Sequence, residues 1–115
     1  MAALLALASP VPMAAPALAH AIIVSAAPAA GSTVTGPDVT IAFTFNVRID
    51  ASRSTLTLTA PDGSTHPIAI EASDNPAVLS GRVSGLVAGA YSVRWQVLAT
   101  DGHITRGDVG FTVVP

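Results

Sequence analysis

The feature that most constrains the fold is a strict alternation of apolar and polar side chains in short runs. The longest run, GAYSVRWQVLAT, covers residues 89–100 and places Tyr91, Val93, Trp95 and Val97 on one side of an extended chain. Successive side chains of a β-strand point to opposite faces, so this period of two predicts a strand with one buried face. No helical period stands out after residue 20. The sequence therefore predicts an all-β protein, with Trp95 in its core.

Similar runs occur along the rest of the chain, separated by Gly, Pro, Asn and Asp residues that favour turns. The expected strands cover residues 22–25, 39–45, 54–60, 66–70, 78–83, 90–99 and 108–114. The segment PAAGSTVTGPD, residues 28–38, is rich in turn-forming residues and is predicted to be a loop. About seven strands at this spacing, each with one apolar face, favour two antiparallel sheets packed face to face.

Composition excludes several classes of protein. Hydrophobic residues make up 50% of the 115 residues and charged residues 10%, which favours one folded domain over a disordered chain. The net charge is -2 and all five basic residues are arginine, so the chain lacks the dense basic face that binds nucleic acid. Cysteine is absent, which excludes disulfides, iron–sulfur clusters, thiolate zinc sites and cysteine nucleophiles.

The first nineteen residues have most features of an export signal. They are nearly all apolar and carry no charge, and their unbroken apolar stretch, Ala2 to Ala8, is shorter than the roughly 20 residues that cross a bilayer. The sequence ALA at residues 17–19 has the A-x-A form that signal peptidase accepts. Residues 1–19 are therefore predicted to be a signal peptide, and residues 20–115 a mature domain that starts with His20 in the periplasm or elsewhere outside the cytoplasm.

Two alternatives to this assignment remain open. No Lys or Arg follows Met1, so the positively charged start of a signal is missing, and the segment also fits a disordered extension or a wrongly assigned start. A second A-x-A sequence at residues 19–21 would direct cleavage beyond His20 and remove that histidine.

The sequence ATDGH, residues 99–103, ends the longest apolar run with two side chains that bind metals. In an extended chain, Asp101 and His103 lie on the same side of the backbone, and Gly102 between them leaves the approach open. An imidazole nitrogen and a carboxylate oxygen together suit a borderline divalent metal. Taken alone, the motif is a weak signal and favours a turn aspartate beside a solvated histidine over a metal site.

His20 would add two further donor atoms to Asp101 and His103 if export leaves it as the first residue. Its α-amine and its imidazole Nδ1 would then close a six-membered chelate ring on one ion, since an α-amine with a pKa of about 7.7–8.0 loses its proton readily. Copper(II) stands highest in the divalent series for such donors and accepts a square arrangement of nitrogen and oxygen. Three nitrogens and one oxygen from His20, Asp101 and His103 would fill that square, whereas structural zinc prefers closed tetrahedral sites.

Several motifs resemble the CopC-type periplasmic copper-resistance proteins. They are HAIIVSAAPAAGSTV at the predicted mature start, GPDVTIAFTF, GLVAGAYSVRWQVLATDGHITRG and the closing FTV, and they span nearly all of residues 20–115. The resemblance implies a small Greek-key, immunoglobulin-like β-sandwich and a copper(II) site made by the amine and imidazole of His20 with Asp101 and His103. It also implies a role in copper homeostasis or resistance, in which copper is sequestered or delivered to a CopD-type membrane importer.

The methionines separate this chain from one version of that family. Some members hold a second, copper(I) site of clustered methionines with a histidine, whereas Met1 and Met13, the only methionines here, lie in the predicted signal. The resemblance therefore implies a copper(II)-only form, and we expect a monomer with one copper per chain. The remaining histidine, His66, precedes a proline and is interpreted as a surface residue whose role stays open. Arg94 and Arg106 are interpreted as solvated charges rather than partners of Asp101.

Two other functions are compatible with parts of this pattern. Copper mono-oxygenases that cleave polysaccharides also use an amine–imidazole chelate, but they act from aromatic surfaces, and aromatic residues make up only 4% of this chain. Asp101 as a ligand would also occupy a position that oxygen chemistry needs open. A structural or adhesion sandwich without metal is the other alternative. The sequence favours a copper(II)-binding protein that is not an enzyme.

Overall fold

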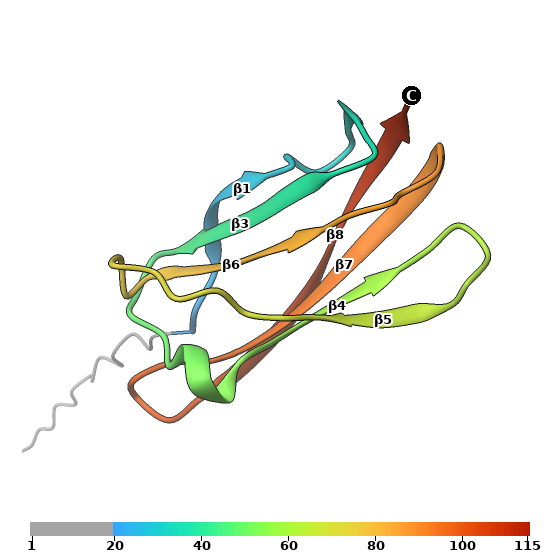
Figure 1. Cartoon of the computed structure of the whole chain (residues 1–115). Coiled ribbons are helices and arrows are strands. Elements are labelled where there is room, and N and C mark those ends of the chain that lie inside the picture. The colour runs from blue at the N-terminus through green and yellow to red at the C-terminus, as the bar shows by residue number, and fades with distance from the viewer. Residues whose placement is uncertain (1–19) are drawn as a thin grey trace, which may run out of the picture.

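The computed structural model describes residues 20–115, which form two β-sheets packed face to face (Figure 1). The smaller sheet has the strand order β1–β3–β6 and the larger sheet the order β2–β8–β7–β4–β5. The strands are β1 (Ile23–Ala27), β2 (Ser32–Thr35), β3 (Val39–Phe45), β4 (Thr55–Thr59), β5 (Thr65–Ile68), β6 (Val78–Val83), β7 (Gly89–Leu98) and β8 (Ile104–Val114), with one 3-10 turn, η1 (Ala51–Arg53). The predicted all-β, immunoglobulin-like sandwich is confirmed, while the predicted signal peptide lies outside the described residues.

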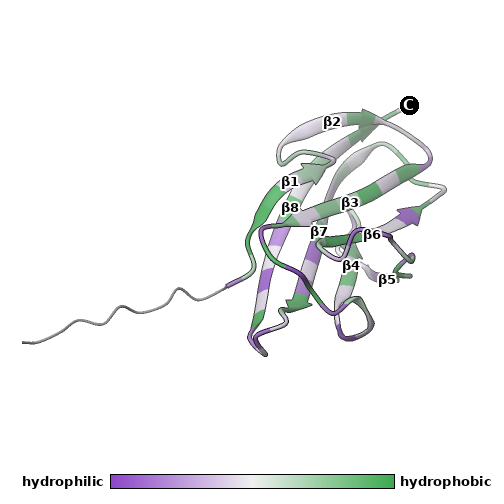
Figure 2. Cartoon of the chain, turned by 90° about the vertical axis from the view of Figure 1, so that its left-hand side faces the viewer, coloured by the Kyte–Doolittle hydropathy of each residue, from purple (hydrophilic) through white to green (hydrophobic). Residues whose placement is uncertain are grey.

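The core forms between the two sheets from the alternating side chains that the sequence indicated. Along β3, Ile41 and Phe43 are fully buried and their neighbours Thr40 and Ala42 are not, and the same alternation is visible along the strands in Figure 2. Trp95 lies in this core with 8% of its surface exposed, and its ring meets the ring of Phe45 edge-on at a centroid distance of 5.1 Å. Trp95 is therefore a packing residue, as expected.

Trp95 packs onto a glycine of the neighbouring strand. Gly107 of β8 stands opposite Trp95 of β7, and a Cβ atom at Gly107 would lie 2.5 Å from the indole Cζ2. Real Cβ atoms do not approach a ring that closely, so the absence of a side chain lets the indole lie on the β8 backbone. This contact supports the strand pair that ends in the ATDGH turn.

The prediction that residues 28–38 form a loop was wrong at their centre. Ser32–Thr35 form β2, which pairs in parallel with the end of β8, from Ser32 opposite Phe111 to Thr35 opposite Val114. The three residues Thr33, Val34 and Thr35 are β-branched and suit an extended backbone, while the turn-forming residues flank them. The described chain thus has eight strands rather than about seven, and this one pair is parallel.

Three strand boundaries also differ from the prediction by two residues or more, and β1 ends at Ala27 rather than at residue 25. β8 starts at Ile104 rather than at residue 108, because its first residues pair with β7 from Leu98 opposite Ile104 onward in spite of their polar side chains. β5 ends at Ile68 rather than at residue 70, because the chain then leaves for the other sheet, where Glu71 bridges to Ser80.

The two hairpin turns of the larger sheet lie at its opposite ends (Figure 1). β4 and β7 are antiparallel, with Thr59 opposite Ser92 and Thr55 opposite Gln96. The turn that follows β4, residues 60–64, therefore lies beside the start of β7. The turn that follows β7, residues 99–103, lies at the other end, where the described chain also begins.

Candidate metal centre

The ATDGH segment forms a tight turn between β7 and β8. The Ala99 N–H donates to the His103 carbonyl at 2.9 Å, and the Gly102 N–H donates to the Ala99 carbonyl at 2.9 Å. Gly102 has a φ of +90°, a backbone conformation that side chains disfavour, so glycine is suited to this position. The turn fixes the backbone of both residues that the sequence singled out.

Asp101 and His103 do converge, but not because they share one side of a strand. Neither residue belongs to a strand, and the Asp101 side chain folds back onto the turn, where Oδ1 accepts the His103 backbone N–H at 2.9 Å. The other carboxylate oxygen, Oδ2, lies 3.0 Å from Nδ1 of the imidazole. The turn therefore produces the convergence that the sequence analysis attributed to extended geometry. The His103 side chain stays 60% exposed, which leaves the imidazole accessible to an ion from solvent.

The start of the described chain lies against this turn. The rings of His20 and His103 are 5.6 Å apart between centroids and inclined at 56°, although the two residues are 83 positions apart. Ala21 follows with 1% of its surface exposed, and its carbonyl accepts a hydrogen bond of 3.1 Å from the Thr105 hydroxyl. Ile22 is held to Asn46 by two hydrogen bonds, of 2.9 and 3.0 Å. His20, Asp101 and His103, the three predicted site residues, are thus brought to one end of the sandwich.

Asp101 is the anionic group of this cluster. The backbone N–H of His103 is the main cause that lowers the pKa of the Asp101 carboxyl below its ordinary value of 3.8, and the His103 side chain adds to the effect. Charge on His20 contributes in the same direction, which agrees with its position near the carboxylate. Asp101 is therefore ionised at neutral pH and attracts a cation.

The arginines that flank the motif in sequence have partners of their own. Arg94 forms a two-point contact with Asp108, at 3.1 and 3.0 Å, and Arg106 donates from Nε to Gln96 at 2.8 Å. These contacts are exposed and do not involve Asp101, and they agree with the interpretation of both residues as surface charges.

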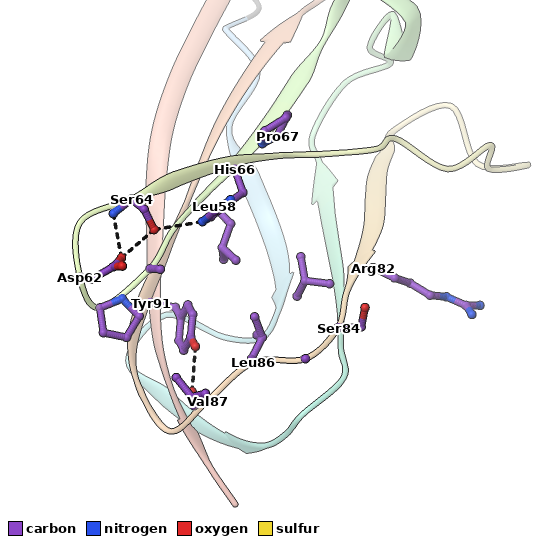
Figure 3. Close-up of a pocket in the computed structure, with 14 residues that line it drawn as sticks. Leu58, Asp62, Ser64, His66, Pro67, Arg82, Ser84, Leu86, Val87 and Tyr91 are labelled. Carbon is purple, nitrogen blue, oxygen red and sulfur yellow. Dashed lines mark hydrogen bonds between the residues drawn. The ribbon is translucent and has the colours of Figure 1, made fainter.

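His66 lies at the opposite end of the sandwich. It is exposed, and its Nε2 lies 3.0 Å from the Ser64 hydroxyl, which also donates to Asp62 at 2.6 Å (Figure 3). These side chains line an open pocket of about 600 Å³ between the turn after β4 and the segment that follows β6. The structure does not bring His66 to the other two histidines.

The donor atoms at the His20 end suit a nitrogen-binding ion. Two imidazoles whose centroids are 5.6 Å apart can both reach one ion through bonds of about 2 Å. Within residues 20–115, however, no three His, Asp or Glu side chains already form a group that could hold a metal. The His20 end therefore offers candidate donors that lie near one another rather than an assembled site.

Asn46 and Thr105 are residues that the sequence analysis missed. Each contacts the backbone of residues 21–22 from a distant part of the chain, 24 positions away for Asn46 and 84 for Thr105. A hydrogen bond between a side chain and a distant backbone group leaves no pattern in the sequence, so neither residue could be identified from the sequence alone.

Fold and site together define an immunoglobulin-like β-sandwich with a candidate metal centre at one end. The family model described as the CopC domain matches residues 23–114, so the chain belongs to the CopC family. The resemblance stated from the sequence motifs is thereby confirmed. Within the described residues, no helix is long and apolar enough to span a membrane.

The similar proteins include copper resistance proteins and a CopC protein. The copper resistance protein C of Pseudomonas syringae pv. tomato is 33% identical over 102 residues, which cover 83% of this chain and 81% of that protein. The crystal structure of CopC from Methylosinus trichosporium OB3b superposes with a TM-score of 0.75 at 27% identity, over 84% of this chain and 95% of that one. PcoC, a methionine-rich copper resistance protein from Escherichia coli, gives a TM-score of 0.64 at 28% identity, over 84% of this chain and all of its own.

Proposed function

We propose that this chain is an exported copper(II)-binding protein that holds one copper ion and serves copper resistance or homeostasis outside the cytoplasm. The observation that carries the proposal is the placement of the His20 ring 5.6 Å from the His103 ring, with the Asp101 carboxylate against the second imidazole. Membership of the CopC family supports copper as the ion.

Each donor has a defined part in this proposal. The α-amine and Nδ1 of His20 chelate the ion, and Asp101 supplies a negatively charged oxygen. His103 supplies an imidazole nitrogen, and its contact with Asp101, 3.0 Å between Nδ1 and Oδ2, has to give way when both side chains bind the same ion. Three nitrogens and one oxygen match the tetragonal preference of copper(II).

The amine donor requires cleavage after Ala19. With residue 19 attached, the nitrogen of His20 is an amide without the free lone pair of an amine, and the chelate is lost. We therefore propose that residues 1–19 are removed as a signal peptide, which leaves His20 at the first position of the mature protein.

The mature protein then acts as a carrier rather than an enzyme. All four donors of the square come from the protein, which favours holding copper over oxygen chemistry. We propose that a monomer sequesters copper or delivers it to a CopD-type membrane importer.

The test is a copper titration of protein that starts at His20, in competition with a chelator of known affinity. Asp101→Ala, His103→Ala and a variant with one residue added before His20 should each weaken binding, by about 100-fold for the loss of a direct ligand, because even outer partners of ligands are worth 10–100-fold. Undiminished tight binding in all three variants would refute the proposed site. Saturating copper should also raise the free energy of unfolding, by about 4 kcal/mol at 1,000 times Kd.

A further inference from the structure

We infer that Thr105 and Asn46 are positioning residues, which hold the start of the mature chain so that His20 faces His103. The consequence for copper rests on the proposed function, whereas the position of the chain start is a property of the metal-free protein. Neither residue contributes a donor atom to the proposed site.

Thr105 joins the two halves of the candidate centre directly. It lies two residues after His103 on β8, and its hydroxyl donates to the carbonyl of Ala21, the residue that follows His20, at 3.1 Å. This hydrogen bond fixes the backbone next to the first histidine relative to β8, the strand that follows the second. The side chain of Ala21 is 1% exposed, so its methyl group is packed in the core beside this bond.

Asn46 fixes the next residue along the chain. It follows β3, and its Oδ1 accepts the Ile22 N–H at 2.9 Å while its own backbone N–H donates to the Ile22 carbonyl at 3.0 Å. The Ile22 side chain is 57% exposed, so burial contributes little to holding this residue. Its backbone is held through Asn46 on one side and through the buried Ala21 on the other.

This arrangement matters because a chain terminus is ordinarily loose. The ends of a domain stay poorly ordered unless they are tied down, and a ligand that must order them binds more weakly for that reason. With residues 21 and 22 fixed, only His20 itself remains to be ordered when its chelate closes. The bonds made by Thr105 and Asn46 therefore raise copper affinity through preorganisation of the site.

The experiment uses mature protein starting at His20 and two measurements. The first is the {¹H}–¹⁵N heteronuclear NOE of the Ala21 and Ile22 amides without metal, which reports motion of the backbone. The second is copper affinity by chelator competition. Thr105→Val keeps the shape of the side chain and removes the hydroxyl, and Thr105→Ser keeps the hydroxyl. Asn46→Ala removes the acceptor for Ile22, and Asn46→Asp retains one.

We expect Thr105→Val and Asn46→Ala to lower both NOE values and to weaken copper binding about tenfold each, in the range known for outer partners of metal ligands. Thr105→Ser and Asn46→Asp should restore most of the rigidity. Thr112→Val is the matched control, since Thr112 is an exposed threonine of the same strand, roughly 23 Å from Thr105 at 3.3 Å per residue. It should change neither measurement.

The outcomes separate this inference from the proposed function. If the wild type binds copper tightly and Thr105→Val and Asn46→Ala change neither the NOE values nor the affinity, the positioning role is wrong and the copper site stands. If Thr112→Val weakens binding as much as Thr105→Val, the effect is a general loss of stability and the role is again wrong. If the wild type does not bind copper, the proposed function fails, and the NOE values alone decide whether the two residues hold the chain start.

Discussion

Two turns of this molecule have the same backbone hydrogen-bond pattern and lie at opposite ends of the larger sheet. Residues 60–64 read APDGS and residues 99–103 read ATDGH. In each, the N–H of the first residue donates to the carbonyl of the fifth, at 2.8 and 2.9 Å, and the glycine N–H donates back to the first carbonyl at 2.9 Å. The two glycines have nearly the same φ, +87° at Gly63 and +90° at Gly102.

The turns differ at their second and last residues and in what lies opposite. Asp62 accepts both the N–H and the hydroxyl of Ser64 on Oδ1, whereas Asp101 uses Oδ1 for the backbone of His103 and Oδ2 for its imidazole. The first turn packs Pro61 against Gly89, and the second faces His20. The turn itself thus orients a carboxylate, and the proposed copper site needs the histidine and the chain start in addition.

Exchanging the last residues of the two turns should produce the largest effect. His103→Ser gives the second turn the sequence ATDGS, keeps the aspartate and the backbone, and should weaken copper binding about 100-fold or more because a ligand is lost. Chelator competition measures this change, and a circular dichroism spectrum like that of the wild type shows that the fold is retained.

The reciprocal change is the control for this exchange. Ser64→His is combined with His66→Ala, because His66 lies 3.0 Å from Ser64. The double variant gives the first turn the sequence APDGH with no chain start and no second imidazole beside it. A second tight copper site in this variant would show that the turn alone is sufficient, contrary to the comparison. We expect the number of tightly bound copper ions to stay at one.

The packing of Trp95 against Gly107, in the strand pair joined by the second turn, can be tested by substitution. Gly107→Ala places a Cβ atom 2.5 Å from the Trp95 ring, and forced overpacking of this kind costs about 1–3 kcal/mol in the free energy of unfolding. Gly110→Ala on the same strand is the matched control, since the nearest atom to its Cβ is 3.7 Å away. Urea unfolding should separate the two variants, and equal stability would contradict the contact described for Trp95.

The glycines of the two turns should respond alike in stability and differently in copper binding. An alanine at Gly63 or Gly102 meets no atom within 4 Å, so its cost is the left-handed backbone alone, about 1–2 kcal/mol. Both variants should lower the unfolding midpoint similarly. Gly102→Ala alone should weaken copper binding, because it shifts Asp101 and His103. A loss of affinity in Gly63→Ala as well would mean that the turn after β4 influences the site from the other end of the sheet.

The sequence predicted the sandwich and the three candidate residues for separable physical reasons. Alternation over β3 and β7 is long enough to identify buried faces, and an aspartate two residues before a histidine is visible without a structure. The alternation failed at β2, where four residues between turn formers gave too short a pattern, and at the polar start of β8. The hydrogen bonds from Thr105 and Asn46 to the chain start depend on tertiary packing, which no local pattern encodes. The prediction that cleavage follows Ala19 still awaits its test.

The smallest expected effect concerns how the two turns hold their aspartates. The pKa of each carboxyl is lowered from 3.8, for Asp62 chiefly by the Ser64 hydroxyl and for Asp101 chiefly by the His103 backbone N–H. A lowered pKa stabilises the fold above the ordinary carboxyl value, and the contribution is lost as pH falls through the lowered value. Ser64→Ala removes the main cause at Asp62, whereas His103→Ala leaves the main cause at Asp101 in place. An NMR titration of the carboxyl carbons in metal-free protein should therefore show a larger rise toward 3.8 for Asp62 in the first variant than for Asp101 in the second. The reverse order would mean that the imidazole, rather than the turn backbone, is the principal partner of Asp101.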